Sequence, residues 1–163
     1  MTCIGSCVVK ATILIVDDSP EIQRYLRTLL ELEAYLVMAV GSGYEALEIL
    51  AHAPVVDVVL LDMQMPGIDG LEVLRQMGEF VPKVKVIMCS GLNDPAKISQ
   101  ALALGAEAYL SKPIQHLYLS AAVARCLQKV SATRPMEQRK PQLFVMPSTI
   151  PTEHASLLPN FKS

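Results

Sequence analysis

Residues 58–62 read Val-Val-Leu-Leu-Asp, a run of branched apolar residues that ends in a carboxylate. Residues 13–16 and 86–89 are similar apolar runs, and Asp17 directly follows the first of them. Short runs rich in Val and Ile are typical of parallel strands that helices cover on both faces. None of them approaches the roughly 20 apolar residues that a bilayer span requires. The hydrophobic fraction of 52% and the mean hydropathy of +0.36 therefore indicate a covered parallel sheet.

Strand and helix patterns alternate between residues 12 and 130. Ser19 is a suitable helix N-cap, and Pro20 suits the first helical position. Five strands that alternate with five helices predict an α/β fold with parallel βαβ units and right-handed crossovers. In such sheets, ligands bind outside the carboxyl ends of the strands. The expected strands are 12–16, 36–40, 55–61, 85–89 and 108–110. One expected helix starts at Pro20, three span 43–52, 71–78 and 115–130, and one runs from an Asp94 cap to Gly105.

Charge and composition divide the chain into a domain with two flanking segments. Residues 1–130 hold 10 basic and 14 acidic residues, whereas residues 131–163 hold 4 and 2. This asymmetry is too weak to indicate a nucleic-acid or membrane partner. The last segment contains five prolines and no helical period, so we expect a disordered or loosely docked tail. The predicted organisation is an extension (1–10), a domain (11–130) and a tail (131–163).

The four cysteines divide into two pairs. Cys89 ends an apolar run and Cys126 lies in a helical pattern, so both are expected in the core. Cys3 and Cys7 could form half of a metal or redox site, but no second pair completes it. Residues 4–7 faintly resemble a lipoprotein cleavage box, without the charged and apolar stretches that precede such a site. We therefore expect a cytoplasmic protein.

Polar residues stand at four of the predicted strand ends. Asp17 and Asp18 end the first strand, Asp62 the third and Ser90 the fourth, and Lys112 follows the fifth. Three adjacent carboxylates raise one another's pKa unless a cation lies between them. Mg²⁺ suits such oxygen ligands and leaves room for a phosphate. With a lysine and a hydroxyl nearby, this set predicts a phosphoryl-transfer site.

Three segments carry a family resemblance: residues 13–19 (Ile-Leu-Ile-Val-Asp-Asp-Ser), 60–70 (Leu-Leu-Asp-Met-Gln-Met-Pro-Gly-Ile-Asp-Gly) and 108–113 (Ala-Tyr-Leu-Ser-Lys-Pro). In this order and spacing, they resemble the receiver domains of two-component response regulators. The resemblance covers residues 11–130, and it is a resemblance to family members that consist of a receiver domain alone. It implies a flavodoxin-like, doubly wound sheet of five parallel strands in the order 2-1-3-4-5, with five helices.

The resemblance also implies a role for each site residue. Asp62 would be the phosphoacceptor. Asp18 and Asp62 would bind Mg²⁺ directly, Asp17 through water, and the backbone carbonyl of Gln64 would complete the shell. For Asp17 and Asp18, the alternative is a purely structural role at the N-terminus of the following helix, where acidic residues are favoured.

For the phosphorylated state, the resemblance implies that Ser90 and Lys112 contact the phosphoryl group and that Tyr109 is the switch aromatic. The Lys112–Pro113 bond would be cis. An aromatic residue on a short edge strand often only packs, and that alternative for Tyr109 stays open. Gln64 and Leu92 would flank the attacking water, and Leu92 offers no polar group, so we expect it to control the phosphoryl lifetime by steric effects.

The implied function is a phosphorylation-dependent switch that takes its phosphoryl group from a histidine kinase or phosphotransfer protein. The output surface would be the fourth helix, fifth strand and fifth helix, binding a target protein or a second copy. The alternatives are a phosphorelay intermediate, a phosphate sink, a degenerate receiver, or a phosphatase with Asp62 as nucleophile. Gln64 stands where dehalogenase-type phosphatases typically carry a second acid, and the intact acidic set speaks against degeneracy. We expect neither direct DNA binding nor catalysis beyond self-phosphorylation and dephosphorylation.

Overall fold

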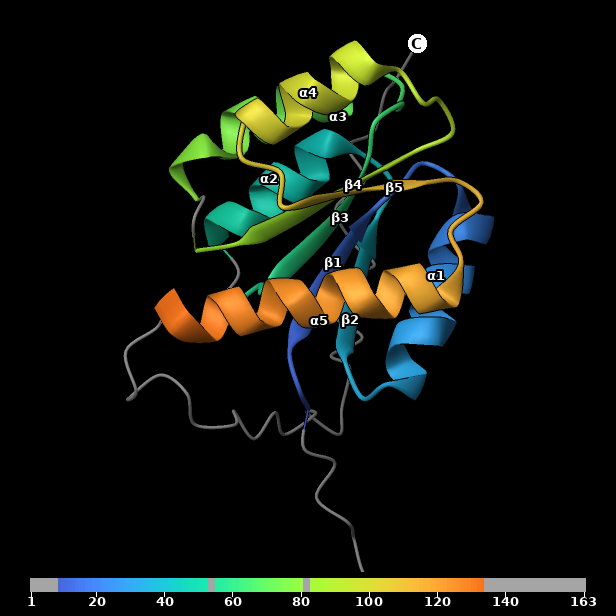
Figure 1. The fold of residues 1–163 in the computed structure, drawn as a ribbon, viewed down its shortest axis with the longest axis vertical. Helices are drawn as coiled ribbons and strands as arrows, with labels where there is room; N and C mark the ends of the chain where they lie inside the picture. Colours follow the sequence, from blue (N-terminus) through green and yellow to red (C-terminus); the bar gives the residue numbers. More distant parts are fainter. Residues whose placement is uncertain (1–8, 53–54, 81–82, 134–163) are drawn as a thin grey trace, which may run out of the picture.

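Five parallel strands form one sheet in the order β2-β1-β3-β4-β5 (Figure 1). The computed structural model describes residues 9–52, 55–80 and 83–133. The parallel register pairs Val16 with Val40 and Leu61, and Asp62 with Cys89. This confirms the predicted flavodoxin-like topology. The strands are β1 (Thr12–Val16), β2 (Leu36–Val40), β3 (Val58–Asp62), β4 (Lys85–Ser90) and β5 (Ala108–Ser111).

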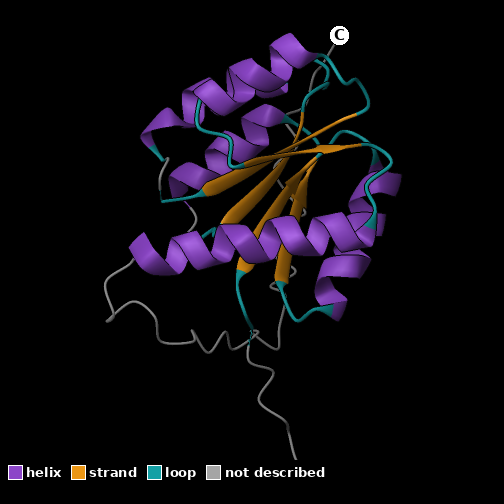
Figure 2. Ribbon diagram, in the orientation of Figure 1, coloured by secondary structure: helices purple, strands orange, loops and turns teal. Residues whose placement is uncertain are grey.

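Helices cover both faces of the sheet, as Figure 2 shows. The first and last helices lie on one face, and the other three lie on the opposite face (Figure 1). Ser19 caps the first helix through its side chain, with Pro20 at the first position as predicted. The helices are α1 (Pro20–Leu32), α2 (Gly43–His52), α3 (Gly70–Gln76), α4 (Pro95–Ala103) and α5 (His116–Thr133), with a 3-10 turn, η1 (Met77–Glu79), after α3.

Each face of the sheet has its own hydrophobic core. On β1, Ile13 and Ile15 pack with α1 and α5, whereas Leu14 and Val16 pack with α2, α3 and α4. All four side chains are fully buried. This explains why the strands read as continuous apolar runs instead of alternating apolar and polar residues. Cys89 and Cys126 are buried in the α1/α5 core, which confirms their prediction as core residues.

Several predicted boundaries shift. β3 begins at Val58 and not at residue 55, because its pairing with β1 starts at Ile13 and Val58. Just before this point, the Asp57 N–H donates to the Thr12 carbonyl (2.9 Å) and the Lys85 N–H donates to the Asp57 carbonyl (3.0 Å). The predicted 71–78 helix starts one residue earlier, after the Asp69 cap, and its last turn tightens into η1. α4 ends at Ala103, and Gly105 (φ 102°) reverses the chain just beyond it.

The other differences lie at the ends of strands and of the last helix. β3, β4 and β5 each extend one residue past the predicted end and so include Asp62, Ser90 and Ser111. α5 begins at His116 and continues to Thr133, three residues past the prediction. No helix in the described part of the chain is long and apolar enough to span a bilayer. Cys3, Cys7 and the predicted tail from residue 134 onward lie outside the described residues.

Candidate functional site

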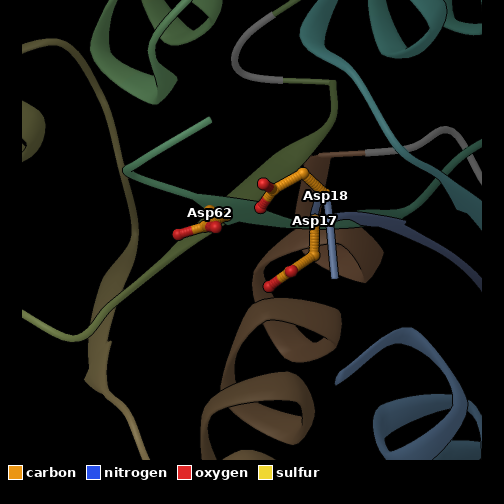
Figure 3. Close-up of side chains that lie close together, drawn as sticks. All are labelled: Asp17, Asp18 and Asp62. Carbon is orange, nitrogen blue, oxygen red and sulfur yellow. The ribbon is translucent and has the colours of Figure 1, made fainter. Parts of the chain in front are cut away.

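Three carboxylates meet where β1 and β3 end. Asp17 and Asp18 follow β1, and Asp62 is the last residue of the adjacent strand β3. One carboxylate oxygen from each residue lies within 4.8 Å of the other two. Figure 3 shows the three side chains gathered around one small volume. Asp17 and Asp62 are buried and Asp18 is exposed, so the group opens to solvent on one side.

The Asp17 segment is fixed by backbone and side-chain hydrogen bonds. The backbone N–H of Ser19 donates to Asp17 Oδ1 at 2.9 Å. Gln23 on α1 donates its amide to the carbonyl oxygens of Asp17 (2.6 Å) and Val40 (3.2 Å). Gln23 thus joins the ends of β1 and β2. This role of Gln23 was not predicted, although its spacing of three and seven residues from the buried Leu26 and Leu30 places a polar side chain on the apolar face of the helix.

Lys112 is the cation of this site. Its Nζ lies 2.7 Å from Asp17 Oδ2 and 3.1 Å from Asp62 Oδ2. Burial disfavours the Lys112 ammonium, but the hydrogen bond to Asp17 and the charges of both carboxylates outweigh this, and the pKa of Lys112 is raised. The backbone N–H of Lys112 donates to the Ser90 carbonyl at 2.7 Å, and the Lys112–Pro113 peptide is cis, as predicted.

Asp62 is only 5% exposed, at the end of the central strand β3. Burial raises the pKa of the Asp62 carboxyl, while the backbone N–H of Gln64, which donates to Oδ1 at 3.2 Å, and the charge of Lys112 act against this. The loop after Asp62 packs closely against the backbone of Asp62 itself. A Cβ on Gly70 would lie 2.2 Å from the Asp62 carbonyl oxygen, so a glycine is required where the loop turns back on the strand.

Ser90 and Tyr109 lie on adjacent strands, β4 and β5. The Ser90 hydroxyl is buried, donates to the Leu92 carbonyl (3.3 Å) and accepts from the Leu92 N–H (3.1 Å). The Tyr109 hydroxyl donates to the same Leu92 carbonyl. The structure thus places Asp17, Asp18, Asp62 and Lys112 together, whereas the Ser90 hydroxyl is engaged by the loop that follows it.

The donor set fits a divalent metal ion. Three carboxylates face a single ammonium, and no ion pair among the described residues involves Asp18. The excess negative charge and the oxygen-only ligands suit Mg²⁺, which binds through few carboxylates and keeps several waters. The open side at Asp18 leaves room for such waters.

The comparisons with known proteins agree with this geometry. The family model described as "Response regulator receiver domain" matches residues 13–124. The rice two-component response regulator ORR7 is 36% identical over 118 residues, which make up 71% of this chain and 56% of the relative. The chain thus spans little more than half of that relative. The chemotaxis protein CheY of Halobacterium salinarum is 34% identical over 103 residues, covering 63% of this chain and 85% of CheY.

Solved structures give the same result. A receiver domain from Clostridium thermocellum is 31% identical with a TM-score of 0.72, covering 76% of this chain and 99% of that one. A CheX–CheY complex with BeF3 and Mg²⁺ from Borrelia burgdorferi contains a chain that is 30% identical with a TM-score of 0.66, covering 71% and 87%. With the sheet order 2-1-3-4-5 and the acidic group at the strand ends, these matches show that the chain belongs to the response-regulator receiver domains of two-component systems.

Proposed function

We propose that this chain is a switch that accepts a phosphoryl group on Asp62 from a histidine kinase or a histidine phosphotransfer protein. The observation that carries the proposal is the position of Asp62. Its carboxylate lies beside two other carboxylates and 3.1 Å from the Lys112 ammonium. An anionic nucleophile among groups that neutralise charge is the arrangement that phosphoryl transfer uses.

In the proposed reaction, a carboxylate oxygen of Asp62 attacks the phosphorus atom of a phosphohistidine. A P–O bond forms to Asp62 while the P–N bond breaks, and its electron pair and a proton from water go to the imidazole nitrogen. Lys112 pairs with a phosphoryl oxygen as the phosphoryl group moves toward Asp62. Hydrolysis by water returns the free carboxylate and releases inorganic phosphate.

Asp17, Asp18, Asp62 and the backbone carbonyl of Gln64 are the groups that would hold Mg²⁺. When bound, the ion would neutralise the carboxylates and the phosphoryl oxygens. The hydrogen bonds of Asp17 to Ser19 and of its carbonyl to Gln23 hold this ligand in place before any ion arrives. The Mg²⁺ in the related CheX–CheY complex is consistent with this assignment.

The switch would use Ser90 and Tyr109. Phosphorylation adds acceptor oxygens at the strand edge, and the Ser90 hydroxyl can serve them only by leaving Leu92. Tyr109 is tied to the same loop residue, so both side chains respond to one loop position. α4 follows this loop, and the surface formed by α4, β5 and α5 is the proposed output face, binding a target protein or a second copy.

The test is incubation of the protein with Mg²⁺ and phosphoramidate, followed by intact-mass spectrometry. We expect one phosphoryl group on the wild type, its release by hydroxylamine, and none on Asp62→Asn. Asp69→Asn is the matched control, because Asp69 is an exposed aspartate in the loop after β3 and asparagine also caps helices. A wild type that gains no phosphoryl group overturns the proposal, and many turnovers of a small phosphoester would replace the switch with a phosphatase.

A further inference from the structure

Tyr25 on α1 makes a long-range contact that the function proposed above does not use. Its hydroxyl donates to the carbonyl oxygen of Ile114 at 2.9 Å, in the loop between β5 and α5. This loop carries Lys112 two residues earlier. Figure 1 shows the loop running down beside α1 before α5 begins. Tyr25 is 47% exposed, so burial in a core does not explain why a tyrosine stands at this position.

The contact closes a ring that starts and ends at Asp17. From Asp17, the chain enters α1 through the Ser19 cap and reaches Tyr25 two turns later. The Tyr25 hydroxyl holds Ile114, and the chain from Ile114 leads back through Pro113 to Lys112. The Lys112 ammonium closes the ring at Asp17 Oδ2, 2.7 Å away. α1 thus connects the acidic residues with the loop that carries Lys112.

Other contacts fix the same loop at its two ends. On the β5 side, the Lys112 N–H donates to the Ser90 carbonyl. On the α5 side, Glu33 at the end of α1 bonds His116 (2.7 Å) and Ser120. Between these two anchors, Tyr25 is the described side chain that hydrogen-bonds to the loop backbone. Without its hydroxyl, the segment from Lys112 to His116 keeps only its end anchors and the buried Ile114 side chain.

We propose that Tyr25 is a positioning residue for Lys112. The Tyr25 hydroxyl holds the β5–α5 loop in place, so that the Lys112 ammonium stays beside Asp17 and Asp62. Tyr25 touches no reacting atom and acts through Lys112. The proposal rests on the function proposed above, because the ammonium has to meet the phosphoryl oxygen in a fixed place. A cation displaced by a fraction of an ångström loses much of its effect in a preorganised site.

The experiment compares Tyr25→Phe with the wild type in Mg²⁺-dependent phosphorylation by phosphoramidate. Losing one hydrogen bond at a distance corresponds to a fall in the maximal rate of about three- to tenfold. The half-saturating concentrations of Mg²⁺ and phosphoramidate should stay within about twofold. Tyr44→Phe is the control, because Tyr44 is exposed on α2, across the sheet, and its hydroxyl has no hydrogen-bond partner in the described part of the chain.

A double-mutant cycle separates positioning from a general structural effect. In a Lys112→Ala background, Tyr25→Phe should cause no further loss, because the group that it positions is gone. An unchanged rate in Tyr25→Phe, or a loss that persists in the Lys112→Ala background, overturns the proposal.

A second readout does not depend on phosphorylation. The NMR signal of the Lys112 ammonium should broaden in Tyr25→Phe and stay sharp in Tyr44→Phe, because its two carboxylate partners slow its exchange with water in the wild type. If the wild type gains no phosphoryl group, the proposed function fails, and this signal still decides the role of Tyr25. An unchanged signal in Tyr25→Phe contradicts the positioning role.

Discussion

Ser90 and Tyr109 share one hydrogen-bond acceptor, the carbonyl oxygen of Leu92. The two donors come from neighbouring strands, and Leu92 lies in the loop that leads to α4. The position of this one carbonyl oxygen therefore depends on the hydrogen bonds of both side chains. If one donor leaves, the other becomes the main tether of this loop.

The first prediction concerns this tether. Tyr109→Phe keeps the ring and removes the hydroxyl, so the loop between Ser90 and Asp94 should open more often. Amide hydrogen exchange of Gly91 and Leu92 should rise by about two- to tenfold, the equivalent of one lost hydrogen bond. The rate of Asp62 phosphorylation should stay within about twofold, because the Tyr109 hydroxyl donates to the Leu92 carbonyl and not to a carboxylate of the site. Unchanged exchange would show that the shared carbonyl does not restrain the loop.

The second prediction concerns the Lys112 charge. Lys112→Ala should slow phosphorylation by phosphoramidate about 100-fold, as expected when a preorganised electrostatic group is lost. Mg²⁺ should bind at least as tightly, because the substitution removes a positive charge from between Asp17 and Asp62. Titration calorimetry measures the affinity. Lys83→Ala is the control, since Lys83 is exposed and forms no ion pair among the described residues.

The third prediction concerns the close approach of Gly70 to Asp62. Gly70→Ala places a methyl group 2.2 Å from the Asp62 carbonyl oxygen and 2.8 Å from Met63 Cα, so the backbone has to move. The free energy of unfolding in urea should fall by about 1–3 kcal/mol. At Gly78, an added Cβ meets nothing within 4 Å, so Gly78→Ala should be neutral or slightly stabilising. Equal effects of the two substitutions would contradict the contact.

The fourth prediction concerns the buried thiols. Burial raises the pKa of Cys89 to about 12 and that of Cys126 to about 11, against an ordinary value of 9.0. At pH 8, the native Cys3→Ser/Cys7→Ser protein should therefore resist iodoacetamide and react fully in urea. Rapid labelling of the native protein would contradict the burial of both thiols.

The same shifts predict a loss of stability at alkaline pH. Above about pH 9, the unfolded chain loses its thiol protons while the native chain keeps them. The free energy of unfolding should therefore fall as pH rises from about 9 to 11, and below pH 9 these thiols should have no effect. Replacing Cys89 and Cys126 by Ala should flatten this fall, and an equal slope in that variant would assign it to other groups.

Much of the fold could be predicted because each level of the sequence points the same way. The apolar runs of the strands and the Ser19–Pro20 helix start lie where the structure has them, and Gly105 reverses the chain two residues past the end of α4. The start of β3 could not be predicted from its own residues, because Val55 and Val56 are as apolar as the strand itself, and its first pairing, Val58 with Ile13, depends on a segment far away in the sequence. The end of α5 shows the same limit, since the apolar pattern gave no sharp stop.

The charged residues of the candidate site could be predicted from the sequence, whereas the residues that hydrogen-bond to the backbone around them could not. Asp17, Asp62 and Lys112 stand at strand ends, where topology brings them together. Gln23 and Tyr25 act through side-chain contacts with backbone carbonyls of segments far away in the sequence. Such contacts depend on the distance between elements, which no local pattern encodes. The roles of Ser90, Gln64 and Tyr109 in the phosphorylated state stay predictions.

The sheet is also a partition between two cores. Tyr109 packs against the core that α2, α3 and α4 share, whereas Ile114, just past Lys112, belongs to the core of α1 and α5. Residues on one side can therefore be exchanged without repacking the other. The α4 side can therefore change in sequence while the contacts of α1 with Asp17 and with the loop after Lys112 stay the same.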